Sequence, residues 1–381
     1  MVQATISYKI HMGHARKQLL SIYVTAQCNL RCKYCALSAG DIKLDDKDKV
    51  IDFNFVKRGI LDFFRDYPSR GIRFYAAGEP TMAMSIIKQT VDFVRELPNF
   101  KPYFELQSNG YFSHDKAKWL KDNINFIWIS FDGLPEFQNQ NRPTYNGNNS
   151  ASVVVNNIEY FSESSNVDLG VRVTLTPNMI DRQKEIIDFL NGLSVKYISV
   201  ERAFTSVNKE RYQAEDVDPI YFAQKFLEAF NYAKNLGIFY NHFNMVNFDE
   251  PVRFFCRSCV PYPHLTTDGY VSSCDMAQFG CEKYTSYSIP DLVYGKYDKE
   301  TDHIFYDEEK IHKIRQKNAD YLSETECKNC SIIYNCAGGC LGQSYNETGN
   351  IRGKTDWDCA VTRYLAERMP RHEELYPILH P

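Results

Sequence analysis

Short runs of β-branched and aromatic residues alternate with longer amphipathic segments over the first 240 residues. Six runs predict strands: LLSIYVTA (19–26), GIRFYAAG (71–78), YFELQSNG (103–110), FIWISFDG (126–133), LGVRVTLTP (169–177) and VKYISV (195–200). After each comes a segment whose apolar residues recur at helical spacing: 52–66, 85–97, 114–123, 151–161, 181–193 and 221–237. Parallel strands connect through such crossovers, so the pattern predicts an α/β fold with a parallel sheet. An open barrel and a flat doubly wound sheet both fit six units.

The periodic pattern ends near Gly237, and cysteine, glycine, proline and tyrosine become frequent from about residue 250 onward. This composition predicts a small, loop-rich domain held by metal rather than a second hydrophobic core. Within it, HLTTDGYVSSC (264–274) has an Asp-Gly pair between two β-prone runs, which predicts a hairpin. The last segment, DWDCAVTRYLAERMPRHEELY, predicts a helix that Pro370 interrupts.

Charge and hydropathy exclude several classes of protein. The 44 basic and 48 acidic side chains are spread along the whole chain, so neither a nucleic-acid-binding stripe nor an acidic tail stands out. No stretch approaches the roughly 18 to 20 apolar residues of a membrane span. The N-terminal residues lack the apolar segment and cleavage site of a signal peptide. We therefore expect a cytoplasmic protein whose partners are neither nucleic acids nor membranes.

Twelve cysteines form two groups, one at positions 28, 32 and 35 and a larger one of nine between 256 and 359. Thiols stay reduced in the cytoplasm, so such cysteines more commonly bind metal than form disulfides. Cys28 follows the first predicted strand, and active sites of parallel α/β folds form at the carboxyl ends of strands. A cubane iron–sulfur cluster normally takes four thiolates, so three would leave one iron open to another ligand. A zinc site is the alternative interpretation.

The motif C-x3-C-x2-C, with Tyr34 before its last cysteine and after the first strand of a β/α array, resembles the radical S-adenosylmethionine (SAM) enzymes. The resemblance implies a partial (β/α)6 TIM-type barrel, a [4Fe-4S] cluster on Cys28, Cys32 and Cys35, and SAM as the ligand of the open iron. In that family the reduced cluster cleaves SAM into methionine and a 5′-deoxyadenosyl radical.

Motifs at the later strand ends agree with this resemblance. AGEP (77–80) is similar to the family's GGEP-type motif, with alanine in place of the first glycine, and QSNG (107–110) and SFDG (130–133) end the next two strands. The resemblance implies these SAM contacts: Gly78 and Glu79 for the amino group, Ser108 and Asn109 in the pocket, Ser130 for the ribose, Arg172 for the carboxylate, and Tyr34 and Val200 beside the adenine. Taken singly, such residues are more often ordinary turn or strand-end residues.

The later cysteines resemble the seven-cysteine SPASM domain of radical SAM enzymes. Cys259, Gly269 and Cys274 give C-x9-G-x4-C, and the motif C-x2-C-x5-C-x3-C runs from Cys327 to Cys340. The resemblance implies two auxiliary [4Fe-4S] clusters, one on Cys256, Cys259, Cys274 and Cys340, the other on Cys327, Cys330, Cys336 and Cys359. Cys281 remains, either as a buried small residue or in place of Cys256. A pair of zinc ribbons is the alternative.

The same resemblance divides the chain into four parts: an N-terminal segment (1–18), the radical SAM barrel (19–240), the SPASM domain (241–363) and a C-terminal helix and tail (364–381). In sulfatase-maturing members an aspartate at the position of Asp275 is proposed to take a proton from the substrate, which makes Asp275 a catalytic candidate. An aspartate that solvates a turn is the alternative.

SPASM enzymes mostly modify peptides or proteins, so the resemblance implies a precursor-peptide maturase. It would abstract hydrogen from a peptide residue and oxidise that residue by two electrons to a thioether, ether or carbon–carbon crosslink. The alternatives are an anaerobic sulfatase-maturing enzyme that forms formylglycine and a non-catalytic electron carrier or zinc scaffold. Low-potential clusters imply an anaerobic setting and an electron donor of flavodoxin or ferredoxin type. Leader-peptide binding, if any, would need a separate protein or the SPASM surface.

Overall fold

Seven parallel strands make up the central sheet of the structure, a computed structural model that describes residues 18–75, 77–98, 101–243, 248 and 251–369. They are β1 (Leu19–Tyr23), β2 (Gly71–Tyr75), β3 (Tyr103–Ser108), β4 (Phe126–Ser130), β5 (Asp168–Leu175), β6 (Tyr197–Arg202) and β7 (Phe239–Asn241). The six predicted strands are all present, so the predicted α/β fold is confirmed. β7 was missed, because three residues are too short to produce a pattern. The expected N-terminal segment, apart from Gln18, and the tail beyond Met369 lie outside the described residues.

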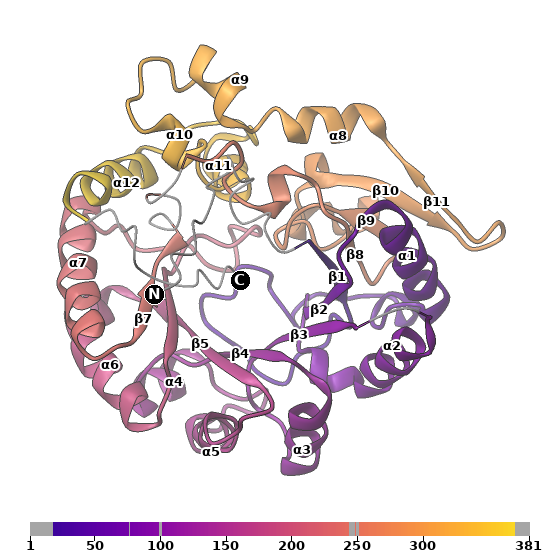
Figure 1. The fold of residues 1–381 in the computed structure, drawn as a ribbon, viewed down its shortest axis with the longest axis horizontal. Coiled ribbons are helices and arrows are strands. Elements are labelled where there is room, and N and C mark those ends of the chain that lie inside the picture. Colours follow the sequence, from indigo (N-terminus) through magenta and orange to yellow (C-terminus); the bar gives the residue numbers. More distant parts are fainter. Residues whose placement is uncertain (1–17, 76, 99–100, 244–247, 249–250, 370–381) are drawn as a thin grey trace, which may run out of the picture.

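Helices cover the outer face of the curved sheet (Figure 1). The predicted ones are α1 (Phe53–Asp66), α2 (Met84–Glu96), α3 (His114–Asn123), α5 (Ala151–Ser162), α6 (Gln183–Gly192) and α7 (Pro219–Asn235); the short α4 (Pro135–Asn141) was not predicted. Their ends follow ordinary capping chemistry. The Asp52 side chain, for example, accepts a hydrogen bond from Asn54 N (2.8 Å) at the start of α1.

The inner face of the sheet is polar. Along β2, Ile72 and Phe74 belong to the hydrophobic core beneath the helices, whereas Arg73 and Tyr75 line an interior cavity. Side chains on a strand alternate between its faces, and the neighbouring strands repeat the pattern. Their cavity-lining residues include Gln107, Ser130, Arg172, Ser199 and Glu201. A closed (β/α)8 barrel is instead filled with branched apolar side chains, so this open one has room for a polar ligand.

The sheet continues beyond β1 into the C-terminal region, in the order β11-β10-β9-β8-β1-β2-β3-β4-β5-β6-β7. β8 (His264–Leu265) pairs in parallel with β1, and β9 (Tyr270–Ser272), β10 (Val293–Asp298) and β11 (His303–Tyr306) follow in antiparallel pairs. The predicted hairpin is confirmed: it turns at Gly269, whose φ is +85°. The sheet does not close on itself, because β7 and β11 are its edges.

The remaining helices are α8 (Glu308–Arg315), α9 (Ala319–Glu324), α10 (Ile333–Cys336), α11 (Leu341–Thr348) and α12 (Asp356–Arg368). They lie along the side on which the sheet stays open, and α12 packs against α7 (Figure 1). The C-terminal region is therefore more regular than its composition predicted, and residues such as Val271 and Leu365 join the same hydrophobic core as the barrel. Among the described helices, none combines the length and hydropathy that crossing a bilayer requires.

Candidate active site

The loop after β1 carries Cys28, Cys32 and Cys35 and lies at the carboxyl end of the barrel strands. Backbone hydrogen bonds of 2.8 to 2.9 Å hold it against residues 141–145, which begin at the last residue of α4. The three thiols are close enough to affect one another's ionisation, so the structure brings the predicted group together.

A hydrogen-bond donor lies near each of these three sulfurs. The pairs are Asn109 Nδ2 with Cys28 Sγ (3.8 Å), Arg142 Nη1 with Cys32 Sγ (4.0 Å) and the Ala39 amide with Cys35 Sγ (3.3 Å). Burial raises the pKa of Cys32 to about 12, although Arg142 opposes the rise. A thiol in this position loses its proton on binding metal, and donors directed at sulfur stabilise the resulting thiolate. The donor set therefore fits an iron–sulfur cluster.

A cavity of about 210 Å³ lies beside this loop, and Tyr34, Ser130 and Arg172 are three of the predicted SAM contacts that line it. The hydroxyl of Tyr34 donates a short hydrogen bond to Asp132. Arg172 Nη1 donates to Gln107 Oε1 (3.1 Å).

Glu79 has a structural role that the sequence did not reveal. Its buried carboxylate accepts hydrogen bonds from Ser108 Oγ (2.7 Å), Asn109 N (2.7 Å) and Thr81 Oγ1 (2.7 Å). Burial raises the pKa of Glu79, and these bonds oppose the rise. The carboxylate thus holds the ends of β2 and β3 together, and the Ser108 hydroxyl is used within the protein rather than directed into the cavity.

Gly78 lies where two segments of the chain come very close together. A Cβ at this position would lie 2.1 Å from the carbonyl oxygen of Gln27, the residue before the first cysteine. Only glycine fits there, because the obstacle is backbone rather than a flexible side chain. Gly78 therefore places the end of β2 against the cysteine loop.

The side chain of Val200 bears on the predicted contact with adenine. Its side chain is fully buried in the hydrophobic core, and strand alternation directs it away from the interior that the adjacent Glu201 lines. The predicted contact between the Val200 side chain and adenine stays a prediction, and the burial of Val200 in the core does not support it.

Arg142 is a buried cation that sequence reasoning missed. Its Nε donates to Asp132 Oδ1 (3.0 Å), its Nη2 donates to Thr174 Oγ1 (3.2 Å), and its guanidinium lies 5.2 Å from the centre of the Tyr34 ring. It lines the same cavity as Arg172 but is ion-paired with Asp132, which leaves Arg172 as the guanidinium better placed for an anionic ligand. Arg142 was missed because it follows the unpredicted α4.

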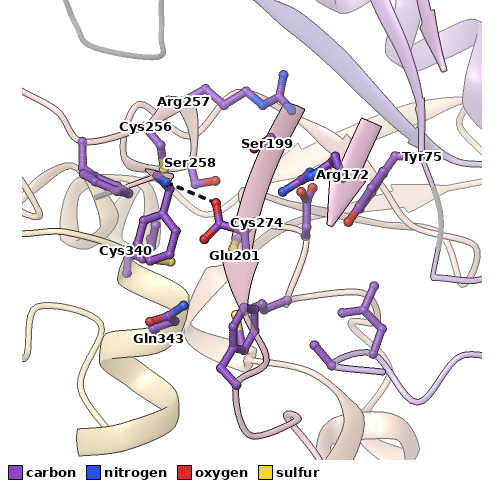
Figure 2. A pocket seen from close by; sticks show the side chains of 18 of the residues that line it. Tyr75, Arg172, Ser199, Glu201, Cys256, Arg257, Ser258, Cys274, Cys340 and Gln343 are labelled. Carbon is purple, nitrogen blue, oxygen red and sulfur yellow. Dashed lines mark hydrogen bonds between the residues drawn. The ribbon is translucent and has the colours of Figure 1, made fainter. Parts of the chain in front are cut away.

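A second cavity, of about 250 Å³, lies between the barrel and the later cysteines (Figure 2). Residues of the barrel strands, among them Arg73 and Ser199, line one side, and Cys256, Cys274 and Cys340 line the other. It shares lining residues with the first cavity, including Tyr75, Arg172, Glu201 and Phe204. The two cavities are therefore adjacent, and a group bound at their junction would face both cysteine sites.

Asp275 faces the second cavity but is already paired. Arg73 Nη2 donates to both of its carboxylate oxygens, at 2.8 and 2.9 Å, and His264 Nδ1 lies 3.4 Å from Oδ1. Burial opposes ionisation of Asp275, but Arg73 and His264 outweigh it and the pKa is lowered. Asp275 is therefore an ion-paired carboxylate at the cavity wall.

Glu201 lines the same cavity as Asp275, but its pKa shifts in the opposite direction. Burial raises its pKa to about 8, and Arg172 offsets that rise only in part. Its Oε1 accepts a hydrogen bond from Phe243 N (3.2 Å), while among the described residues nothing donates to Oε2, which lies 3.5 Å from His242 Nε2. Burial also lowers the pKa of His242 to about 3, so that imidazole is neutral. Two carboxyl groups with opposite pKa shifts thus share one cavity.

The later cysteines separate into the two predicted groups. Cys274 and Cys340 interact electrostatically with Cys256, which is hydrogen-bonded to Cys259. The other four, Cys327, Cys330, Cys336 and Cys359, line one cavity of about 100 Å³. In the described part of the chain, no three His, Cys, Asp or Glu side chains converge closely enough to hold a single metal ion.

Cys281 lies apart from both groups. It packs at the edge of a small apolar cluster formed by Ala26, Ala77, Phe279 and Tyr284. Its amide donates to Asp268 Oδ2 (2.8 Å). Its position favours a packing role and leaves Cys256 as the partner of Cys259.

Comparison with known proteins finds one matching family and several distant relatives. Residues 22–190 match the model of the radical SAM superfamily. The chain is 22% identical over 388 residues to the radical SAM cyclopropyl synthase TigE of Paramaledivibacter caminithermalis, covering 96% of this chain and 76% of TigE. It is 21% identical over 339 residues to the cysteine-type anaerobic sulfatase-maturating enzyme of Clostridium perfringens, covering 82% of this chain and 85% of that enzyme.

Solved structures share the fold. The anSMEcpe structure with bound AdoMet has a TM-score of 0.72 at 17% identity and covers 92% of both chains. The SAM-bound structure of Streptococcus suis SuiB has a TM-score of 0.60 at 14% identity and covers 90% of this chain and 77% of SuiB. These structures show the shared fold, and the family match, together with the three cysteines after β1, identifies residues 22–190 of this chain as a radical SAM domain.

Proposed function

We propose that this protein is a radical SAM enzyme that oxidises a residue of a ribosomally made precursor peptide by two electrons and thereby forms a crosslink. The observation that carries the proposal is the junction of the two interior cavities, one beside Cys28, Cys32 and Cys35 and one beside Cys256, Cys274 and Cys340. A substrate carbon at the junction would be close to a radical source on one side and to an electron acceptor on the other.

Three [4Fe-4S] clusters and SAM are the cofactors of this proposal. The first cluster would be held by the three cysteines after β1, with SAM in the cavity lined by Tyr34, Ser130 and Arg172. When bound, they supply one-electron cleavage of SAM and hence removal of hydrogen from an unactivated carbon, which side-chain acids and bases cannot achieve. The chain's own contribution is to position ligands: Asp132 and Thr174 orient Arg142, and Gln107 orients Arg172.

The relatives favour a peptide substrate. TigE is named a cyclopropyl synthase and the Clostridium perfringens relative a sulfatase-maturating enzyme. One anSMEcpe structure contains the Cp18Cys peptide, and one SuiB structure contains the precursor peptide SuiA. We extend a peptide substrate to the present chain. We also propose a low-potential electron donor of flavodoxin or ferredoxin type and a reducing anaerobic cytoplasm. Leader-peptide binding would be carried out by a separate protein or by residues 241–363.

The cofactor assignment is tested on protein purified and reconstituted without oxygen. We expect about twelve irons per chain, for three four-iron clusters, and release of 5′-deoxyadenosine from SAM after reduction with dithionite. Replacing Cys28, Cys32 and Cys35 with alanine should remove about four irons and abolish nucleoside release. About two zinc ions per chain and no nucleoside would overturn the proposal.

The substrate is tested by co-expression with the product of the neighbouring gene, followed by mass spectrometry. A crosslinked short peptide, lighter by about two hydrogens, supports the maturase. An aldehyde on a sulfatase would instead establish formylglycine formation, the alternative function.

A further inference from the structure

Lys317, in the turn between α8 and α9, is a fully buried lysine between the two groups of later cysteines. The thiols that interact electrostatically with its ammonium belong to both groups, Cys259 and Cys340 to one, Cys336 and Cys327 to the other. Burial lowers the pKa of Lys317, and the thiols of both groups oppose that fall, so a single amine lies close to both proposed auxiliary clusters.

In the part of the chain that the structure describes, the ammonium has no acidic partner that explains its burial. Nζ donates to Ser344 Oγ (2.9 Å) and to the carbonyl oxygen of Gly353 (3.0 Å), both of which are uncharged. Within the described ranges, no Asp or Glu forms an ion pair with it. Lysines are almost never fully buried unless paired, and an unpaired buried charge is costly. Thiolates of the cysteine groups are the anions available to balance it.

The segment that joins the two cysteine groups passes beside the Lys317 side chain. Ala337, Gly338 and Gly339, the three residues between Cys336 and Cys340, have φ values of +48°, +81° and +72°. A Cβ on Gly338 would lie 2.1 Å from Leu322 Cδ1 and 3.5 Å from Lys317 Cε. Three successive left-handed residues therefore carry the chain from one cysteine group to the other in contact with the stem of the lysine.

We propose that Lys317 is a positioning residue that acts as the shared counter-ion of the two auxiliary clusters and raises the reduction potentials of both. This inference rests on the two auxiliary clusters of the proposed function. A cluster with four thiolate ligands is an anion that becomes more negative on reduction, so a nearby positive charge stabilises the reduced form. The effect is strong in a buried site, where the effective dielectric is low. Because one charge faces both groups, both potentials rise together.

The test measures potentials rather than turnover. In a background in which Cys28, Cys32 and Cys35 are alanine, about eight irons should remain, all in the auxiliary sites. Lys317→Met, which keeps the side-chain length and removes the charge, is compared with the background by a dithionite titration followed by electron paramagnetic resonance. We expect both midpoint potentials to become more negative, by about a tenfold change in each reduction equilibrium, or 59 mV for one electron.

Two further variants separate charge from packing. Lys313→Met removes a lysine from α8 that is 59% exposed and paired with Glu309, and it should leave both potentials unchanged. Lys317→Arg keeps the positive charge and should keep both potentials close to those of the background. If Lys317→Met does not retain iron, retention of iron by Lys317→Arg with unchanged potentials still supports the requirement for charge.

Four outcomes would overturn the inference. Unchanged potentials in an iron-loaded Lys317→Met protein would remove the electrostatic role, and a shift in one cluster alone would remove the shared role. Equal loss of iron in Lys317→Met and Lys317→Arg would make the residue a packing element. A background protein that has lysine at 317 and lacks the eight irons would instead refute the cluster assignment, and the inference with it.

Discussion

Arg73 Nη2 donates to both carboxylate oxygens of Asp275, at 2.8 and 2.9 Å, and so joins the second strand of the barrel to the residue that follows Cys274. Arg73 is 2% exposed, and Tyr75 packs against its guanidinium, 4.3 Å from the ring centre. The pair therefore fixes the position of a proposed cluster ligand relative to the barrel interior. The expected catalytic base, the carboxylate of Asp275, is therefore already bonded to Arg73. Asp275 would have to separate from Arg73 before it could accept a proton.

Breaking this pair should destabilise the protein. Asp275→Leu leaves the buried Arg73 guanidinium with Glu105 as its remaining acidic neighbour, and Arg73→Met removes the guanidinium that pairs with Asp275, so each should cost about 3 kcal/mol of unfolding free energy. Arg73→Met combined with Asp275→Leu should cost less than the sum, because each single variant already breaks the same pair. Thermal unfolding of the four proteins without oxygen measures this, and additive losses would show that the two residues are not coupled.

Glu201 should make the protein less stable as pH rises. Its pKa is about 8 in the folded protein against 4.5 for an ordinary glutamate, so between these values the unfolded chain has lost a proton that the folded chain retains. Stability then falls with rising pH across this window, by up to about 1.4 kcal/mol per pH unit, and levels off above it.

Glu201→Gln removes this dependence. Its thermal midpoint relative to the parent protein should therefore increase from about pH 5 to about pH 8 and stay constant beyond. The matched control is Glu185→Gln on α6, where Arg182 lowers rather than raises the pKa of the carboxyl. A constant difference between parent and Glu201→Gln across the whole range would contradict the raised pKa.

Cys256 and Cys281 should differ in their effect on iron content. Cys256→Ala removes a thiol that lies with Cys259, and we expect about four irons to be lost from about twelve. Cys281→Ala removes a thiol packed near Phe279 and should leave the iron content unchanged. Iron analysis with Mössbauer spectroscopy measures both, and the reverse result would exchange the two assignments.

Gly78→Ala should disrupt the first cysteine site. The new methyl group would meet the Gln27 carbonyl at 2.1 Å, so the backbone before Cys28 must move. We expect about eight irons instead of about twelve and no 5′-deoxyadenosine from SAM. Gly192→Ala, where nothing lies within 4 Å of the added Cβ, serves as the control. It should keep all irons and be stabilised by up to about 1 kcal/mol.

The sequence predicted the elements and the cysteine groups because both leave regular signals. The predicted boundaries of 114–123 coincide with those of α3, and 19–26 overlaps β1, since each has a clear apolar period. The cysteines that the motif spacings assign to one group also lie near one another in the structure. Strands as short as β8, with two residues, have no measurable period, so the extension of the sheet beyond β1 could not be predicted.

The interior chemistry could not be predicted because it depends on strand alternation and on contacts between distant segments. Val200 was chosen as a strand-end residue, while its neighbour Glu201 faces the cavities. Arg73 pairs with a residue 202 positions away, so neither sequence context revealed the other. Lys317 looks like an ordinary surface lysine until the fold buries it.

The short segment from Cys336 to Cys340 also bears on how the protein matures. One of its cysteines belongs to each later group, and the three residues between them have a backbone conformation that most amino acids avoid. Filling either site fixes one end of this segment and thereby presets a ligand of the other. The two proposed sites should therefore fill cooperatively during assembly of the intact chain, in which a form with one site occupied is short-lived because it goes on to fill the other.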